Sequence, residues 1–264
     1  MNKLRQLIQR YWPFLSVLAV LLVIIEWAVA REWVPKFIIP RPSDVIKTIF
    51  TQAPQLWTHT QATLLEVIVG VAISIGLGLL IGILLYYSDF IQRAFYPFVL
   101  ISQTIPTIAL SPIFVLWFGY SLWTKVAIIF LITFFPVVVS VFDGLKRTDE
   151  EYLELFRVMG ASKWQMFSQL QWKFALPSIY SGLKMSVVYS LIGAVIGEWL
   201  GGSEGLGYYI RRMSSSIKSE GVFAGILVLS LIGILLFNLV GFLENRSLKY
   251  LNTEKRKKNE KISC

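Results

Sequence analysis

Five ionisable residues stand inside or at the edges of long apolar runs, where a charge is costly. They are Glu26, Glu66, Lys125, Lys184 and Glu198. Ionisable groups in such runs typically serve a function or pair with one another. Most of these five lie near the ends of their runs, where the charge can reach an aqueous interface at little cost. We therefore expect interface placement, rather than solute contact, for all of them except Glu198.

Glu198 and Trp199 begin a glycine-rich segment, residues 201–207. Glycine tolerates backbone conformations that other residues avoid, so this segment could form part of an outer gate, or it could be an ordinary turn. The hypothesis is that Glu198 and Trp199 belong to a solute pathway. In that case Glu198→Ala should reduce uptake while membrane insertion is kept.

Enzymatic chemistry has few candidate residues in this chain, which contains one histidine, His59, and one cysteine, Cys264. We find no Gly-x-x-x-x-Gly-Lys-[Ser/Thr] phosphate loop, no His-Glu-x-x-His motif and no Cys/His cluster with metal-ligand spacing. We expect no enzyme activity, no cofactor or metal bound by this chain, and a surface position for His59.

These residues must be positioned by membrane-spanning helices. Of the 264 residues, 55% are hydrophobic and only 16% are charged, whereas soluble domains carry about 25% charge. Each bilayer span needs about 20 apolar residues. The predicted fold class is an all-α integral membrane protein. Its six transmembrane helices are expected over residues 13–30, 62–87, 94–118, 122–142, 179–200 and 222–243.

The distribution of positive charge predicts the orientation. With the N-terminus inside, the cytoplasmic segments carry 16 of the 25 Lys and Arg residues and the external segments carry 7. Cytoplasmic loops collect these residues, so both termini are expected in the cytoplasm. The net charge of +9 lies largely in two tails, residues 1–12 and 249–264. Charged tails of this kind flank membranes, which argues against a nucleic-acid partner, and residues 13–248 form the predicted membrane domain.

The first span resembles a cleavable signal peptide as well, because basic residues precede an apolar run that ends in Ala28-Val29-Ala30. A signal peptide would be removed from the mature protein. Glu26 and Trp27, just before that tripeptide, fit the interfacial end of a retained span, which we favour. In both cases residue 31 is outside the cell, and the remaining topology is unchanged.

Prolines are concentrated in the middle of the chain. The third predicted span contains Pro97, Pro106 and Pro112, and the fourth contains Pro136. Proline removes a backbone donor and kinks a helix, and a membrane tolerates that only where neighbours or water satisfy the freed groups. Each proline alone is typical of a structural kink, but three in one span favour a transport pathway. We expect Gln103, Pro106 and Pro112 at a pathway or gate.

A long segment, residues 143–178, separates the fourth span from the fifth and is predicted to be cytoplasmic. Loops of this length in a compact chain are usually functional. Thr148 and Glu151 match a capping box that would begin a helix. Gly160 would end that helix in the left-handed conformation.

A second helix in this segment is predicted to begin at Ser162 and Gln165, which match another capping box. It would end at Leu176-Pro177, because proline interrupts helices. The two helices carry many apolar side chains. These side chains could pack against the ends of the spans, or they could insert into a groove on a partner; the sequence gives the two interpretations equal weight.

Glu154, Gly160-Ala161-Ser162-Lys163-Trp164 and Leu176-Pro177 resemble the cytoplasmic signature of binding-protein-dependent ABC importer permeases. That signature begins Glu-Ala-Ala, and this chain has Leu155 and Phe156 in place of the two alanines. Further segments recur in character at matching places, so that the similarity covers nearly the whole chain. They include Pro40-Arg41-Pro42-Ser43, Thr63-Leu64-Leu65-Glu66, Gln103-Thr104-Ile105-Pro106, Leu116-Trp117-Phe118-Gly119 and Gly197-Glu198-Trp199-Leu200-Gly201. Together they resemble the subgroup that serves nitrate, sulfonates, taurine, riboflavin and thiamine-precursor pyrimidines.

This resemblance implies the transmembrane permease subunit of an ATP-driven importer in a bacterial plasma membrane. Two permease chains, by preference a homodimer over a pair of related chains, would form the pathway. Two ABC ATPase subunits, which bind ATP-Mg, would lie beneath them, and an extracytoplasmic solute-binding protein would deliver the solute. The coupling segment would be residues 148–177. Its ATPase-coupling residues would be Glu154, Gly160, Ala161, Ser162, Lys163, Trp164 and Phe167.

The alternative is a stand-alone secondary transporter or channel, which also explains the spans and the prolines. It does not explain the two helices predicted in residues 143–178. Retention of an ATPase subunit in mild detergent would separate the two classes. The solute is not readable from the residues; on overall similarity a thiamine-precursor pyrimidine is favoured over a sulfonate, taurine or nitrate.

Overall fold

The structure is a computed structural model that describes the backbone of residues 2–249 and the side chains of residues 12–249. Every regular element within those limits is helical, so the predicted all-α class is confirmed. Cys264 and residues 250–264 of the predicted basic tail lie outside the described residues. In chain order the elements are α1 (Asn2–Ala30), α2 (Pro42–Thr51), α3 (Ala53–Tyr87), α4 (Asp89–Ser102), α5 (Thr107–Phe118), α6 (Leu122–Lys146), α7 (Glu150–Val158), α8 (Lys163–Gln165), the π-helical segment η1 (Met166–Gln171), α9 (Trp172–Gly201), α10 (Leu206–Ser215) and α11 (Ser219–Ser247).

Within the described residues, five helices are long and apolar enough to cross a membrane, and the bent pair α4–α5 makes a sixth crossing when it is counted as one span. The count agrees with the six predicted spans. The third predicted span, residues 94–118, is nevertheless wrong as a single kinked helix, because α4 and α5 meet at 101° across a short break. Pro106 lies at the N-cap of α5. It has no N–H to continue a helix, and it disfavours helical backbone at Ile105.

The connection between α6 and α9 is shorter than predicted. α6 continues to Lys146 and α9 begins at Trp172, so that Pro177 lies inside α9 and the prediction that it ends a helix is wrong. Ala175 and Ile179, two residues to either side of it, are buried in an apolar cluster with α6. Burial of apolar side chains on both sides of the proline offsets the loss of one backbone hydrogen bond.

Helix α6 is the centre of the bundle, with α3 and α9 packed closely against it. The sequence patterns Gly78-x-x-x-Gly82 and Gly193-x-x-x-Gly197 predict such close packing. A Cβ at Gly78 or Gly82 would stand 2.7 Å from a side-chain atom of α6, and a Cβ at Gly193 or Gly197 would stand 3.0 or 3.1 Å from its Cα atoms. Both patterns therefore let α6 approach its neighbours in the way predicted.

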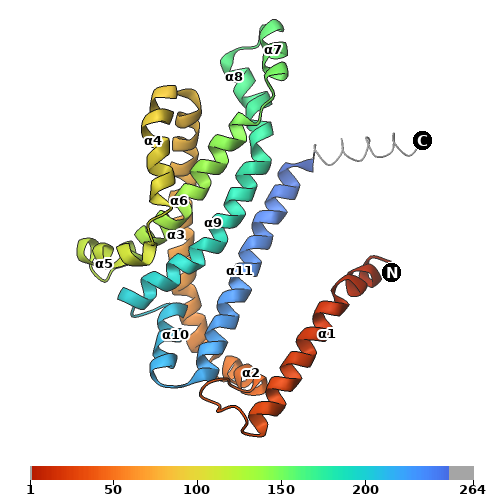
Figure 1. Ribbon diagram of the computed structural model, residues 1–264, viewed down its shortest axis with the longest axis vertical. Helices are drawn as coiled ribbons and strands as arrows, with labels where there is room; N and C mark the ends of the chain where they lie inside the picture. Colours follow the sequence, from red (N-terminus) through yellow and green to blue (C-terminus); the bar gives the residue numbers. More distant parts are fainter. Residues whose placement is uncertain (1, 250–264) are drawn as a thin grey trace.

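The bundle has two distinct ends (Figure 1). Helices α7 and α8 project from one end, shown at the top, whereas α2 and α10 lie at the other. Helix α11 runs beside α9 toward the α7–α8 end, and α1 leans away from the bundle beyond α2. The long helix α9 joins the two ends, which places a different group of predicted functional residues at each.

Candidate functional site

The helix pair (α7, α8 and η1, residues 150–171) is stabilised by local hydrogen bonds at its turn. Gly160 has φ +75°, in the left-handed region as predicted. The Ala161 amide donates to the Phe156 carbonyl at 3.0 Å and the Gly160 amide donates to the Arg157 carbonyl at 3.0 Å. These two bonds form a Schellman motif, which satisfies carbonyls at the end of α7.

Of the two predicted capping boxes, one is confirmed and one is wrong. The Gln165 amide donates to Ser162 Oγ at 3.3 Å, and the Ser162 amide donates to Gln165 Oε1 at 2.8 Å. Asp149, instead of Thr148, is the N-cap of α7, and it makes no side-chain cap hydrogen bond. The Thr148 hydroxyl donates back to the Leu145 carbonyl at 3.2 Å. This bond forms because α6 extends further than predicted, so that Thr148 lies next to a carbonyl at the end of α6 instead of at the start of α7.

The base of the helix pair is tied to α3 through Gln171. The Tyr87 hydroxyl donates to Gln171 Oε1 at 3.0 Å, and Gln171 Nε2 donates to the Tyr86 hydroxyl at 2.8 Å. The Phe167 ring lies 6.0 Å from the Tyr87 ring and 5.9 Å from the Trp172 ring. The helix pair thus joins the bundle at its base.

The tip of the helix pair exposes apolar side chains. We use "tip" for four residues whose exposed fractions are 53% (Leu155), 86% (Val158), 72% (Met159) and 72% (Trp164). Leu153 is buried and Phe156, Met166 and Phe167 are half-buried, so the apolar surface is divided between packing and exposure. Of the other predicted coupling residues, Glu154, Gly160, Ser162 and Lys163 are exposed and Ala161 is half-buried.

A polar groove lies at the break between α4 and α5. It has a volume of about 270 Å³ and adjoins a second hollow of about 180 Å³, and the two share Gln103, Pro136 and Tyr189. Hydroxyl and amide groups line them, and among the described residues no Asp, Glu, Lys or Arg does. The other lining residues are Ser102, Ile105, Thr107, Leu131, Ile132, Phe135, Val139, Ser140, Ser181, Gly182 and Met185.

The structure separates the predicted pathway residues into two groups. Gln103 lines the groove, and Pro106 is exposed in the break beside it. Pro112 is exposed within α5. Glu198 and Trp199 lie at the α10 end, where Trp199 is 48% exposed and Glu198 is fully buried.

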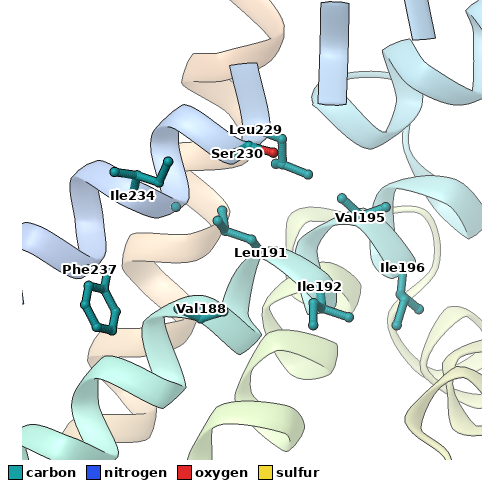
Figure 2. Close-up of a pocket in the computed structure, with 10 residues that line it drawn as sticks. Val188, Leu191, Ile192, Val195, Ile196, Leu229, Ser230, Ile234 and Phe237 are labelled. Atoms are coloured by element: carbon teal, nitrogen blue, oxygen red, sulfur yellow. The ribbon is translucent and has the colours of Figure 1, made fainter. Parts of the chain in front are cut away.

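A larger hollow of about 580 Å³ lies between α9 and α11 and is of a different kind (Figure 2). Of the described residues in its lining, Ser230 alone has a polar side chain, among aliphatic residues and Phe237. Such a surface suits lipid tails or another apolar helix. It offers almost no hydrogen bonds to a polar solute.

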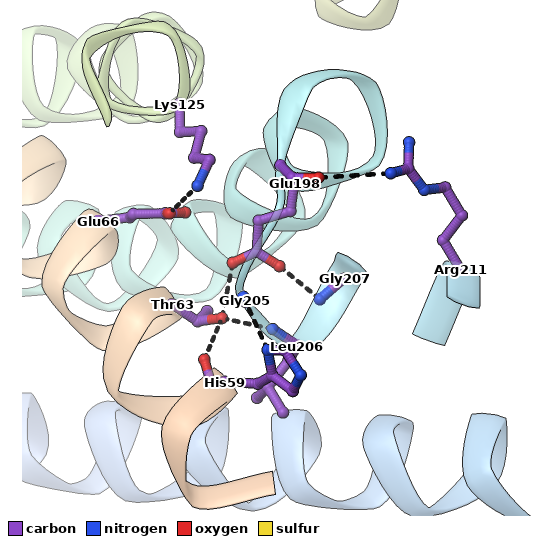
Figure 3. Close-up of polar contacts among 10 residues, drawn as sticks. His59, Thr63, Glu66, Lys125, Glu198, Gly205, Leu206, Gly207 and Arg211 are labelled. Atoms are coloured by element: carbon purple, nitrogen blue, oxygen red, sulfur yellow. Dashed lines mark hydrogen bonds and ion pairs between the residues drawn. The ribbon is translucent and has the colours of Figure 1, made fainter. Parts of the chain in front are cut away.

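A buried polar cluster gathers at the α10 end, with side chains from α3, α6 and α9 and backbone amides from the start of α10 (Figure 3). Lys125 Nζ on α6 lies 2.5 Å from Glu66 Oε1 on α3. The Thr63 hydroxyl donates to Glu198 Oε1 at 2.6 Å, so that α3 is also joined to α9. Glu66 is 2% exposed and Lys125 is 8% exposed. The prediction of interface placement is wrong for both, because each charge is paired within the bundle.

Three successive amides at the start of α10 complete this cluster. Gly205 N donates to His59 Nδ1 at 3.2 Å, Leu206 N donates to Thr63 Oγ1 at 2.8 Å, and Gly207 N donates to Glu198 Oε2. His59 is 7% exposed, so its predicted surface position is wrong. Within residues 12–249, no group of three or more His, Cys, Asp or Glu is arranged to hold a metal ion.

Two other predicted charges lie away from this cluster. Glu26 accepts hydrogen bonds from the hydroxyl and amide of Ser43, at 2.7 and 3.1 Å. Lys184 on α9 pairs with Glu244 on α11, and each side chain is about one fifth exposed. The ion pair of Lys184 therefore retains partial access to its surroundings, unlike that of Lys125.

Sequence reasoning did not find His59, Thr63 and Lys125 as partners of Glu198 and Glu66. Thr63 and Glu66 stand in one of the quoted strings and Glu198 in another, but nothing local shows that these strings meet. Thr63 and Glu198 are 135 residues apart. The available signal was the presence of polar residues in three otherwise apolar helices, α3, α6 and α9, which predicts internal pairing but not the choice of partner.

Comparisons with known proteins agree on the family. Residues 74–249 match the family described as binding-protein-dependent transport system inner membrane component. The chain is 46% identical over 227 residues to the formylaminopyrimidine transport permease protein ThiX of Halalkalibacterium halodurans, covering 85% of this chain and 91% of that one. It is 32% identical over 218 residues to the putative aliphatic sulfonates transport permease protein SsuC of Bacillus subtilis, covering 82% and 79%.

A solved structure shares the fold. A chain of the MetNI methionine ABC transporter in an inward-facing conformation matches with a TM-score of 0.58 and 18% identity, over 74% of this chain and 96% of that chain. At this identity the likeness concerns the fold alone. The resemblance identified from sequence motifs is confirmed by these findings.

Proposed function

Because this chain belongs to the family of binding-protein-dependent transport system inner membrane components and is the permease subunit of an ABC importer, we propose that its helix pair is the coupling segment that docks an ATPase subunit. Two ATPase subunits would bind beneath two copies of this chain. A solute-binding protein would deliver solute at the α10 end. Both termini and the helix pair would then be cytoplasmic, as the distribution of Lys and Arg indicates.

The observation that carries this proposal is the exposed apolar tip on an anchored base. Val158, Met159 and Trp164 are each more than 70% exposed, and a helical apolar surface of this kind suits a groove on a partner. Gln171 joins the base to α3 by two hydrogen bonds. Force applied to the tip would therefore reach the transmembrane helices as a rigid-body displacement.

Co-purification with the ATPase tests this proposal. The permease, expressed with its ATPase subunit, should retain that subunit in mild detergent. Replacement of both Val158 and Met159 by Asp should release the ATPase, because two charges would be carried into an apolar contact. Replacement of Phe90, which is 81% exposed on α4 outside the helix pair, by Asp is the matched control. Loss of the ATPase from the control alone, or from neither variant, would contradict docking at the tip.

For the solute we propose a neutral, polar heterocycle of the formylaminopyrimidine type. The relative with 46% identity is named for formylaminopyrimidine transport. The groove at the α4–α5 break supports the same class, because Gln103, Tyr189 and hydroxyl groups line it, and none of the described residues in its lining carries a charge. A sulfonate or nitrate would favour charge-assisted donors such as Arg or Lys.

Transport in proteoliposomes tests the solute class. The assembled complex with its binding protein should take up labelled formylaminopyrimidine in an ATP-dependent manner, and excess taurine, sulfonate or nitrate should not compete. Gln103→Ala should lower the rate without changing the affinity of the free binding protein for the solute. Uptake of a sulfonate in place of the pyrimidine would contradict the assignment while leaving the permease function intact.

A further inference from the structure

The start of α10 is held by side chains from other helices instead of by its own cap. A helix leaves its first N–H groups without intrahelical partners. The N-cap residue of α10, Gly205, makes no side-chain cap hydrogen bond. His59, Thr63 and Glu198 accept hydrogen bonds from three successive amides at this end (Figure 3). We call these three side chains, with the amides of residues 205–207, the α10 clamp.

The α10 clamp has no room for side chains at its glycines. Gly205 has φ +106°, and a Cβ there would stand 2.2 Å from Glu198 Cδ. A Cβ at Gly207 would stand 2.8 Å from Glu198 Oε2 and 3.0 Å from the Cα of Val195. At these two positions glycine is therefore required because the backbone lies against the Glu198 carboxylate, and not only because glycine tolerates unusual backbone conformations.

Further contacts join α10 to the same two helices. Arg211 donates to the Trp199 and Gly202 carbonyls at the end of α9. The Tyr209 hydroxyl donates to Gln52 Oε1 at 2.7 Å, just before α3 begins. Burial raises the pKa of this Tyr209 hydroxyl, so it remains a donor at neutral pH. Leu206 and Tyr209 are both fully buried in the apolar cluster that includes α3 and α9.

Helix α9 connects this arrangement to the helix pair. It runs without interruption over 30 residues, from Trp172 next to η1 to Gly201 next to the α10 clamp. At 1.5 Å per residue this is about 45 Å. Displacement of the helix pair would therefore be carried along one continuous helix, which contains Pro177 near its start, and Glu198 is three residues from its far end.

We propose that the α10 clamp makes α10 move as one body with the adjoining ends of α3 and α9, with His59, Thr63 and Glu198 as positioning residues. This inference rests on the proposed coupling function. Motion that opens the α10 end then occurs between this body and the α4–α5 pair, across the break at residues 103–106. It does not occur by rotation of α10 alone about the glycines that precede it. Loss of the clamp loosens the joint between α10 and α9, which Arg211 and the buried Leu206 and Tyr209 then hold alone.

Hydrogen exchange of the chain in lipid tests whether the clamp exists. Thr63→Val removes one acceptor and one donor with little change of shape, and the amides of residues 205–207 should then exchange about tenfold faster. Thr63→Ser, which keeps the hydroxyl, should restore slow exchange. Ser74→Ala is the matched control, because Ser74 also joins α3 to another helix through a hydroxyl, lying 2.6 Å from Thr133 Oγ1. Unchanged exchange in Thr63→Val would overturn the clamp whatever the chain transports.

Distances between spin labels in the assembled complex test the motion. In a Cys264→Ser background, labels at the exposed positions Gln61 on α3 and Ser215 on α10 should keep their distance between the nucleotide-free and ATP-trapped states. A label pair at Ser215 and Leu116 on α5 should change its distance. In Thr63→Val the distribution of distances between the labels at Gln61 and Ser215 should broaden. Uptake per ATP hydrolysed should fall, although the amount of assembled complex is unchanged.

The outcomes are separable. A change in the Gln61–Ser215 distance in the wild-type complex would overturn motion as one body. A fall in uptake that only follows a fall in assembled complex would reduce the clamp to a stabilising contact and overturn its positioning role. If the wild-type chain binds no ATPase, the proposed function fails, whereas the exchange experiment still decides whether the clamp exists.

Discussion

The helix pair and the α10 clamp lie at opposite ends of α9 and are stabilised by different kinds of interaction. At the helix pair, the Ser162 capping box and the Gly160 turn join residues close in sequence. At the α10 clamp, Thr63 bonds to Glu198 and to the Leu206 amide across 135 and 143 residues. The first end also exposes its apolar side chains, whereas the second buries its polar ones.

Because of this difference, substitutions at one end should affect partner binding and substitutions at the other should affect stability. Substitutions at the exposed tip remove few internal contacts, such as that of the Trp164 ring, 5.8 Å from the Phe167 ring, so they should alter association with a partner and leave the bundle intact. Substitutions in the buried cluster leave polar groups without partners, and such groups are costly in a bundle interior. Four substitutions with matched controls can sharpen or break the comparison.

The largest loss of stability is expected for Lys125→Met. It leaves the Glu66 carboxylate buried without its ion partner, which costs about 3–5 kcal/mol. The control is Lys184→Met, whose partner Glu244 is partly exposed, so a smaller loss follows. Thermal unfolding in lipid nanodiscs measures both, and the double variant Lys125→Met with Glu66→Gln should recover part of the loss. Equal destabilisation by the two Lys variants would remove the contrast between the pairs.

Gly205→Ala should cause the next largest loss of stability. The added Cβ meets the Glu198 carboxylate at 2.2 Å and the residue has φ +106°, so overpacking and backbone strain together cost about 2–4 kcal/mol. Gly119→Ala is the control, because it has φ +66° but open space around its Cβ and should carry the backbone cost alone. Thermal unfolding compares them, and a loss in Gly119→Ala that matches the loss in Gly205→Ala would contradict a steric role for Glu198.

Gly160→Glu should abolish association with the ATPase and barely affect the bundle. A Cβ at Gly160 would have no neighbour within 4 Å among the described residues. The cost within the chain is therefore the left-handed backbone, about 1–2 kcal/mol, and the remaining effect is a charge at the docking surface. Gly160→Ala shares the backbone cost without the charge and should retain more ATPase. Pull-down from detergent measures this order; a reversed order would count against docking through the turn.

Ser162→Ala should have the smallest effect. It removes the confirmed cap of α8, worth about 1 kcal/mol, and should loosen the turn without releasing the ATPase completely. Ser168→Ala is the control, since the Ser168 hydroxyl bonds to the Trp164 carbonyl in its own helical stretch and does not form the cap. Hydrogen exchange over residues 160–171 should rise in the first variant and stay near the wild-type rate in the second. Unchanged exchange in Ser162→Ala would show that the box does not stabilise this turn.

The sequence by itself determined the features that depend on short-range patterns. Apolar runs of sufficient length predicted the crossings, because a bilayer imposes that length on any helix. Gly160 and the Ser162 capping box were predictable since a turn and a cap each depend on a few consecutive residues. The similar-looking pair Thr148–Glu151 failed because α6 extends past its predicted end, and sequence patterns place helix boundaries poorly.

The tertiary structure alone decided which polar residues meet. Glu66, Lys125, Glu198, Thr63 and His59 come from three long helices and assemble around the start of a fourth element, α10. Their types showed that each needs a partner, because an unpaired polar group in an apolar bundle is costly. The choice of partner depends on the rotation and close packing of α3, α6 and α9, and no local sequence pattern specifies that geometry.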